Sequence, residues 1–269
     1  MIIKKLKGHS GCEIFLCEEN GNKFVRKISP SVDYNNRLIL QMKKQSEFTN
    51  KAIKTPSVLA EGINEKGNYY FDMDYIGGVS LSRFIGTSDI NTSKSIINNL
   101  YNFCHSNLEL ENIIDVTSII KNKISSISLI HQDVFFEKYK RYCIEYDWKN
   151  TIMGKCHGDM TFENIIVYKS ELYLIDFLDS FIESPYIDIS KMLQDLLVMW
   201  SWREESVEPF VKNIILYDQI IKNLSTEEKD TIVRLLIINL LRIIPYADKK
   251  NYTFVKNAIS FLGNKLNIR

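Results

Sequence analysis

The hydrophobic and polar positions alternate over short runs in the first 75 or so residues, a pattern typical of β-strands. Two such runs, 11–17 and 23–29, flank the pair Asn20-Gly21. Because Asn-Gly between apolar runs is a strong signal for a two-residue turn, these runs predict an antiparallel hairpin. The spacing over 34–50 predicts a helix, and 68–76 predicts another strand that ends at Gly77-Gly78.

After Gly78 the apolar positions recur mostly with helical spacing. The predicted helices are 91–107, 113–125, 133–148, 187–203, 207–222, 226–244 and 251–265. Residues 155–178 interrupt them with short strands and loops. The pattern therefore predicts an α+β protein, with a small antiparallel β-rich part over 1–76 and a larger helical part over 77–269.

Composition narrows the class of protein. The chain has 269 residues, of which 45% are hydrophobic and 25% are charged, so it can bury a full core. These values exclude a disordered chain, a collagen-like repeat and a coiled coil. Lys and Arg number 34 against 33 Asp and Glu, a net charge of +1. Because this charge gives no strong field, we expect neither nucleic acid nor a membrane surface as a partner.

The cysteines and the apolar runs indicate the cellular compartment in which we expect the protein. The five cysteines, Cys12, Cys17, Cys104, Cys143 and Cys156, include no CxxC pair, which favours a reducing environment. The apolar run at the start is too short for a signal peptide. The apolar stretch 232–244 carries two arginines and precedes Pro245, so it indicates a buried helix. We therefore expect a soluble, cytoplasmic protein.

The segment 156–167 contains polar residues that are candidates for catalysis and metal binding. Asp159 precedes Asn164 by five residues, and a short strand follows Asn164 directly. A second short strand, 172–175, ends at Asp176, so pairing of the two strands would bring Asn164 close to Asp176. A carboxylate and an amide oxygen at one point suit Mg²⁺. Asp159 could accept the proton of an attacking hydroxyl, which completes the set of groups that phosphoryl transfer needs.

Each of these residues alone has an ordinary explanation as a turn, cap or packed side chain. Their order, His157-Gly158-Asp159 with Asn164 and then Ile-Asp-Phe, matches the catalytic order of protein kinases. With glycine after the histidine, the segment resembles the aminoglycoside phosphotransferase and choline kinase-like family. The resemblance implies a bilobal protein kinase-like fold and ATP as phosphoryl donor. It also implies Asp159 as the catalytic base, Asn164 and Asp176 as Mg²⁺ ligands, and His157 as a residue that orients the loop.

The resemblance also predicts a nucleotide site in the first part of the chain. Lys27 ends a Val-Arg-Lys run that corresponds to the kinase lysine strand, so it is expected to hold the phosphates. Val25 would share its face and pack on adenine, whereas Arg26 would point to the other face, and a one-residue slip would exchange the two. Upstream, Gly8, Ser10 and Gly11 fit a loop that covers the phosphates.

In the family a glutamate on the following helix pairs with the lysine, but here the sequence differs. The acid within this helix is Glu47, which falls nearly opposite the apolar face. Either the helix ends before Glu47, or Gln41 or Gln45 takes the place of the acid. We favour Gln41, which would hold Lys27 by a hydrogen bond rather than an ion pair.

Further assignments follow from the same resemblance. Met73 would lie behind adenine, and backbone groups of Asp74 and Ile76 would bind it. Asp188, in the first turn of a predicted helix, would support the catalytic loop. Independently of the resemblance, Asp195 and Trp202 follow the catalytic segment, and because tryptophan and acids together can bind a sugar face or a cation, they are candidates for contact with the acceptor.

The function that these features predict is ATP-dependent, Mg²⁺-assisted transfer of a phosphoryl group to a hydroxyl of a small molecule. The acceptor could be a sugar, an amino alcohol or an aminoglycoside, and the near-neutral charge favours a sugar. Two alternatives stay open: a Ser/Thr protein kinase, and a non-catalytic nucleotide-binding pseudokinase. The sequence leaves ATP versus GTP as donor and the oligomeric state undecided.

Overall fold

In a computed structural model, the chain folds into two compact units. The structure describes residues 1–6, 8, 11–205 and 209–268. The first unit comprises Met1–Phe84 together with Glu163–Asp179, and the second comprises Ile85–Phe162 and Ser180–Arg269. Each unit therefore draws on two stretches of chain, and each is described by itself below.

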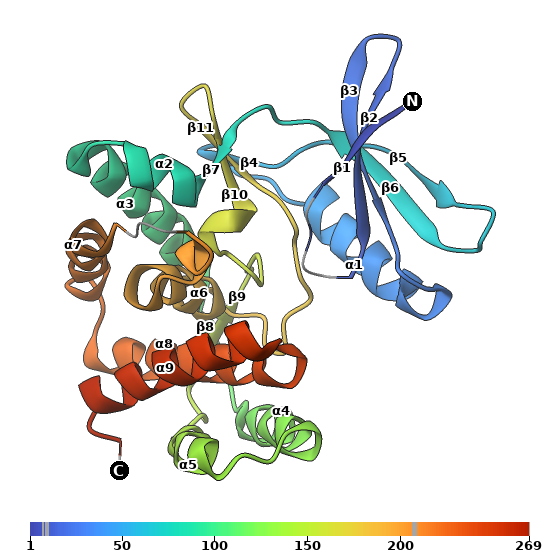
Figure 1. The fold of residues 1–269 in the computed structure, drawn as a ribbon. Coiled ribbons are helices and arrows are strands. Elements are labelled where there is room, and N and C mark those ends of the chain that lie inside the picture. Colours follow the sequence, from blue (N-terminus) through green and yellow to red (C-terminus); the bar gives the residue numbers. More distant parts are fainter. Residues whose placement is uncertain (7, 9–10, 206–208, 269) are drawn as a thin grey trace. The chain divides into compact units, whose positions relative to one another are not determined.

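The first unit is built on an antiparallel sheet (Figure 1). Its described strands, in spatial order, are β1 (Ile2–Leu6), β2 (Glu13–Glu19), β3 (Asn22–Ile28), β6 (Tyr69–Asp74) and β5 (Val58–Ile63). The predicted hairpin of β2 and β3 is confirmed, because Asn20 and Gly21 take positive φ angles of 51° and 79° between the strands. β5 was not predicted, since its sequence lacks a clear alternation and most of its residues are exposed.

Helix α1 (Asn35–Ser46) packs against this sheet (Figure 1). The prediction of a helix over 34–50 is correct in kind and too long at its end. Leu38 and Met42 form a buried cluster with Val25, Phe71 and Met73 of the sheet. This cluster fixes the helix over β3 and β6, so the buried face of α1 lies beside Lys27.

A second, smaller sheet completes the first unit. Its described strands, in spatial order, are β4 (Ile53–Lys54), β11 (Glu171–Leu174), β10 (Ile165–Tyr168) and β7 (Val79–Ser80). Gly78 enters β7 so close to β10 that an added Cβ would lie 2.3 Å from the carbonyl oxygen of Val167. Glycine is therefore required where the chain leaves the large sheet.

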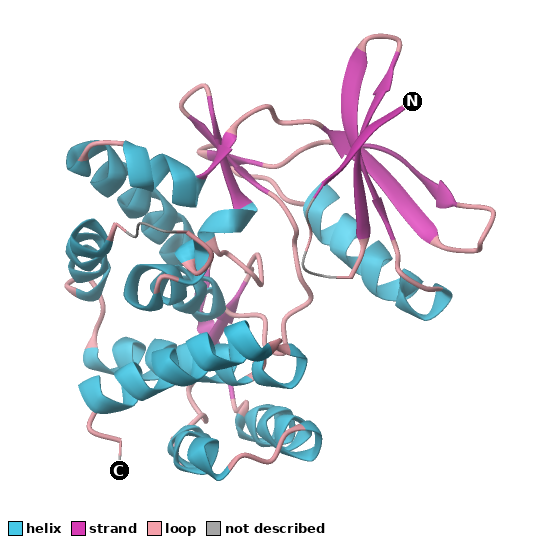
Figure 2. Cartoon of the chain, viewed as in Figure 1, coloured by secondary structure: helices cyan, strands magenta, loops and turns pink. Residues whose placement is uncertain are grey.

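The second unit is mainly helical, as the cyan ribbons of Figure 2 show. Its α-helices are α3 (Ile90–Ser106), α4 (Thr117–Ile130), α5 (Glu137–Ile144), α6 (Pro185–Val198), α7 (Phe210–Ile221), α8 (Thr226–Leu241) and α9 (Lys249–Lys265), and α2 (Leu81–Thr87) precedes them. Short 3₁₀ helices occur at Val32–Tyr34, Val134–Phe136, Phe162–Asn164, Trp200–Trp202 and Ile244–Tyr246. Helices α6 and α8 pack together and carry long runs of buried residues.

Several helix predictions in this unit were wrong at their ends, among them the helix over 226–244, because α8 ends at Leu241. Residues 207 and 208, with which the helix predicted over 207–222 begins, lie outside the described residues. The predicted helix over 113–125 begins later, because its first residues belong to strand β8 (Leu108–Ile114), which pairs with the unpredicted β9 (Thr151–Gly154). The helix predicted over 133–148 is reduced to α5 between a 3₁₀ turn and a loop. Helix α6 ends early because Met199 takes a left-handed φ of 58° and its N–H bonds to the carbonyl of Asp195. Among the described residues, no helix has the length and apolar character to cross a membrane.

Candidate active site

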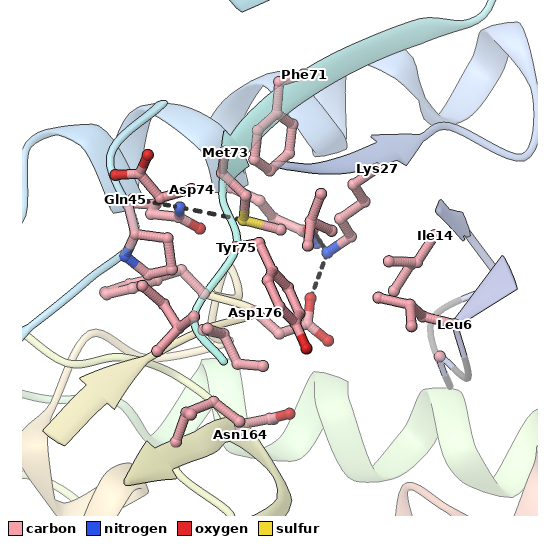
Figure 3. Close-up of a pocket in the computed structure, with 18 of the residues that line it drawn as sticks. Leu6, Ile14, Lys27, Gln45, Phe71, Met73, Asp74, Tyr75, Asn164 and Asp176 are labelled. Atoms are coloured by element: carbon pink, nitrogen blue, oxygen red, sulfur yellow. Dashed lines mark hydrogen bonds and ion pairs between the residues drawn. The ribbon is translucent and has the colours of Figure 1, made fainter. Parts of the chain in front are cut away.

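The first unit contains a cavity of about 350 Å³, a volume typical of small-molecule sites (Figure 3). The residues that line it are Leu6, Gly8, Ile14, Val25, Lys27, Gln41, Gln45, Pro56, Phe71, Met73, Asp74, Tyr75, Ile76, Glu163, Asn164, Ile166, Ile175, Asp176 and Phe177. The structure thus brings most of the residues predicted for the nucleotide and the metal to one cavity.

Lys27 lies at the polar end of this cavity, opposite Asp176 (Figure 3). Its side chain is only 3% exposed. Nζ donates a hydrogen bond to Oδ1 of Asp176, with which it forms an ion pair, and another of 3.2 Å to Oε1 of Gln41. Burial acts to lower the pKa of Lys27, but the charge of Asp176 and the hydrogen bond to it outweigh burial and raise that pKa. Lys27 therefore stays a buried ammonium group.

The register of β3 separates Lys27 from its neighbour. Val25 and Lys27 face the cavity, whereas Arg26 lies on the other face of the sheet. There Arg26 forms a two-pronged ion pair with Asp72, with nitrogen–oxygen distances of 2.7 Å and 2.7 Å. Because this pair holds Arg26 on the outer face, the sheet favours the register in which Lys27 points inward.

Of the three possible partners for Lys27 on or after α1, the structure places Gln41 against it. Gln45 instead donates Nε2 to the carbonyl of Pro56 at 2.9 Å and to Sδ of Met73 at 3.5 Å. Glu47 follows the last residue of α1 and is exposed. Since an ammonium group only donates, the amide oxygen of Gln41 must face Lys27. Its buried Nε2 then has no hydrogen-bond partner among the described residues, so this donor calls for an oxygen from water or a ligand.

The strand pair β10–β11 brings Asn164 and Asp176 to the same end of the small sheet. Ile165 pairs with Leu174, and the N–H of Ile175 donates to the carbonyl of Asn164 at 3.0 Å. Asp176 follows with a left-handed φ of 64°, a conformation that an aspartate tolerates better than most residues. Both side chains line the cavity and offer hard oxygen donors, so the pair fits Mg²⁺. No cluster of three or more His, Cys, Asp or Glu suited to a metal occurs in the described part of the chain, so phosphate and water oxygens would complete the shell.

The segment predicted to bind the nucleotide base also reaches the cavity. Met73, Asp74 and Ile76 line it at the end of β6, and Met73 is buried. Tyr75 lies among them and lines the cavity too, although no sequence pattern singles it out (Figure 3). Gln45, which the sequence suggested only as a partner for Lys27, contacts Met73 instead.

The glycine loop is described only in part. Gly8 lines the cavity, and an added Cβ there would approach Cδ1 of Ile14 to 2.7 Å. Gly11 takes a φ of 77°, is exposed and is not among the lining residues. Ser10 lies outside the described residues. The predicted roles of Ser10 and Gly11 at the phosphates stay predictions.

In the second unit, Asp188 of α6 holds the start of the loop that carries Asp159. Its two oxygens accept hydrogen bonds of 2.6 Å from the N–H of His157 and 2.8 Å from the N–H of Gly158. Gly158 has a φ of 94°, which explains glycine where protein kinases have arginine. Nδ1 of the buried His157 accepts from the N–H of Asp159 at 3.2 Å. His157 and Asp188 thus fix the backbone on either side of Gly158.

Asp195, two helical turns after Asp188, holds the end of the same loop. Its oxygens accept hydrogen bonds of 2.6 Å from the N–H of Phe162 and 2.7 Å from the N–H of Ser201. Trp202 packs its ring edge-on to Phe162, with 6.0 Å between the ring centroids. Both side chains are buried, and Asp195 is already engaged with backbone amides. The structure offers them a supporting role, and their contact with an acceptor stays a prediction.

Asp159 itself reaches solvent, with 23% of its side chain exposed. Nζ of Lys191, on α6, lies 2.9 Å from its Oδ1. Burial acts to raise the pKa of Asp159, but the charge and hydrogen bond of Lys191, with smaller effects of His157 and Arg242, outweigh burial and lower that pKa. Asp159 is therefore a carboxylate at neutral pH, the form that a proton acceptor needs. Lys191 was not identified from the sequence, which gave no sign of this contact.

Solved structures of other proteins share this architecture. No protein-family model matches the chain, and no curated protein matches its sequence. Among solved structures, a thermostable mutant of aminoglycoside phosphotransferase APH(4)-Ia matches 97% of this chain and 94% of its own, with a TM-score of 0.70 and 10% identity. APH(2")-IIia, solved with GDP and kanamycin, covers 99% of this chain and 94% of its own, with a TM-score of 0.63 and 16% identity.

A third match lies outside the aminoglycoside enzymes. It is a putative fructosamine-3-kinase from Haemophilus somnus 129PT, which covers 97% of this chain and 92% of its own, with a TM-score of 0.55 and 13% identity. At the level of the fold, these likenesses confirm the resemblance found in the sequence. The chain has the bilobal α+β, protein kinase-like fold of the aminoglycoside phosphotransferases.

Proposed function

We propose that this protein is an ATP-dependent phosphotransferase that transfers the γ-phosphoryl group to a hydroxyl of a small molecule. The observation that carries the proposal is the cavity in which Lys27, Asn164 and Asp176 meet within a phosphotransferase fold. Structures with this fold were solved with ADP, with AMP-PNP and with GDP, so the fold itself accommodates purine nucleotides.

In this proposal the cavity holds the phosphoryl donor. The base packs on Val25, with Met73 behind it, and meets backbone groups of Asp74 and Ile76, while Lys27 binds the phosphates. Nε2 of Gln41, which has no hydrogen-bond partner in the part of the chain that the structure describes, offers a further donor inside the cavity. Asn164 and Asp176 would hold Mg²⁺, which, when bound, neutralises charge on the phosphates.

Asp159 acts on the acceptor. As a carboxylate it accepts the proton of the acceptor hydroxyl while that oxygen bonds to the γ-phosphorus. The bond from the γ-phosphorus to the bridging oxygen breaks, and the nucleoside diphosphate leaves with the electron pair. Because the transition state of such transfers is loose, most of the catalysis comes from positioning. The hydrogen bonds of Asp188 to the loop supply that positioning for Asp159.

For the acceptor we propose a sugar or a sugar-like molecule with free hydroxyls. Two of the matching structures hold hygromycin B or kanamycin and a third is a putative fructosamine-3-kinase, and all three concern sugar-containing compounds. A polycationic drug is disfavoured by the near-neutral composition and by Lys191 beside Asp159. The short stretch between Asp176 and Asp188 leaves little room for the long activation loop of a regulated protein kinase.

A coupled assay of nucleoside diphosphate release tests this proposal. Mg-ATP and, separately, Mg-GTP are given to the protein with a panel of sugars, amino alcohols and aminoglycosides, and the Asp159→Ala variant is the control. We expect release to rise above the basal rate with at least one sugar-like compound, and only with intact Asp159. Release that no compound stimulates, or that Asp159→Ala leaves unchanged, contradicts the proposal.

A further inference from the structure

Lys191 stands out on α6, a helix that the structure describes completely. All the remaining residues of α6, which runs from Pro185 to Val198, are buried. Lys191 keeps 12% of its side chain exposed and lies at the point where the helix faces the loop of Asp159. A charged side chain on an otherwise buried helix requires a partner, because an isolated buried charge is costly.

The spacing along α6 explains how the helix meets the loop. Asp188, Lys191 and Asp195 are separated by three and then four residues, so they share one face of the helix. Asp188 binds the backbone at His157 and Gly158, and Asp195 binds the backbone at Phe162. Between these two anchors Lys191 meets the side chain of Asp159, with 2.9 Å from Nζ to Oδ1. The same face that fixes the backbone of the loop therefore also contacts its central carboxylate.

The surroundings of Asp159 leave Lys191 as its main source of positive charge. His157 is engaged through Nδ1 with the backbone of the loop. Arg242 acts on Asp159 more weakly. Arg242 donates to Oδ1 of Asn239 at 3.1 Å and lies over the ring of Phe181, with 5.0 Å to its centroid. Nζ of Lys191 lies 2.9 Å from Oδ1 of Asp159, and Lys191 favours the ionised form of Asp159 more than His157 or Arg242 does.

We propose that Lys191 is the positioning residue of the reaction, which holds the Asp159 carboxylate ionised and in one orientation for the acceptor hydroxyl. This inference rests on the function proposed above. Lys191 acts through Asp159 and takes no part in bond making or breaking. It fixes Oδ1 and so sets the rotation of the whole carboxylate, and its positive charge favours the ionised form of Asp159.

Two substitutions at this position separate charge from packing. Lys191→Met keeps a long side chain and removes the charge, whereas Lys191→Arg keeps the charge. We expect Lys191→Met to lower kcat roughly tenfold or more, in the range of general base catalysis, with the affinity for Mg-ATP unchanged. We expect the acidic limb of its kcat–pH profile to move to higher pH, since loss of the positive charge raises the pKa of Asp159. Lys191→Arg should restore most of the rate and the original acidic limb.

A matched control and a second readout make the outcome decisive. Lys121→Met, at an exposed position on α4, should leave the profile of the intact enzyme unchanged. Carbon NMR of labelled aspartate carboxyls, assigned with Asp159→Asn, follows the titration of Asp159 without turnover. If Lys191→Met leaves both this titration and the acidic limb where they were, the inference is wrong. The intact protein could transfer no phosphoryl group while Asp159 of Lys191→Met still titrates at higher pH. That result would overturn the proposed function and leave the ion pair established.

Discussion

Lys27 and Asp176 form an ion pair although 149 residues separate them in the sequence. Helix α1 contributes a neutral partner, Gln41, so Asp176 supplies the carboxylate that balances the buried ammonium group. Both groups line the cavity and both have roles in the proposed reaction. When Mg-ATP binds, Lys27 would turn to the phosphates and Asp176 to the metal. The pair thus keeps both charges compensated and in place before the nucleotide arrives.

The first prediction concerns this pair. In Asp176→Ala, Lys27 loses its carboxylate partner and the metal loses a ligand. We expect phosphoryl transfer to vanish and the affinity for Mg-ATP to fall by about a hundredfold, which corresponds to loss of a buried charged partner. Titration calorimetry with and without Mg²⁺ measures this. Glu171→Ala removes the carboxylate of an exposed ion pair with Lys54 on the small sheet and serves as the control, with near-normal binding expected. Full transfer by Asp176→Ala would remove the metal assignment.

The second prediction concerns Gln41. A glutamate there would give Lys27 a second carboxylate and would delete the buried Nε2 donor. We expect Gln41→Glu to weaken Mg-ATP binding roughly tenfold, because the new carboxylate competes with the phosphates for Lys27 and repels them. Gln41→Met, which removes both hydrogen-bonding groups without adding charge, should weaken binding less. Fluorescent nucleotide displacement compares the three proteins, and tighter binding by Gln41→Glu would refute the role assigned to the neutral amide.

The third prediction separates two roles for Asp195. In the structure its carboxylate accepts hydrogen bonds from two backbone N–H groups, whereas the sequence suggested contact with the acceptor. If the carboxylate supports the loop, Asp195→Ala leaves buried amides without acceptors, a cost of about 1–3 kcal/mol for each. We expect its melting temperature and kcat to fall together while KM for Mg-ATP is kept. Unchanged melting with a raised KM for the acceptor alone would instead favour direct contact with the acceptor.

The sequence predicted those features that depend on local order. Asn20-Gly21 gave the hairpin because an Asn-Gly turn matches the twist of paired strands. The pair of short strands around Lys169 and Ser170 brought Asn164 and Asp176 to one end because strand pairing fixes which residues lie opposite. The inward face of Lys27 followed from the alternation of side chains along β3.

Features that depend on distant contacts were not predictable from the sequence. The local pattern predicts a helix at the end of β8. The segment is a strand because it pairs with β9, which lies far away in the chain, and no local pattern shows that pairing. The contact of Lys191 with Asp159 joins a helix to a loop, and no local pattern encodes it. Asp195 looked like a pocket residue because an acid beside tryptophans is common in binding sites, whereas burial assigns it to backbone amides.

The most direct test of the account follows the γ-phosphoryl group itself. The protein is incubated with γ-labelled ATP and Mg²⁺ in a metabolite extract and, separately, in a protein extract, with Asp159→Ala alongside. We expect label in small, acid-stable molecules, only in the metabolite extract and only with intact Asp159. Label that enters protein instead, or no transfer in either extract while Mg-ATP still binds, would contradict the assignment as a small-molecule kinase.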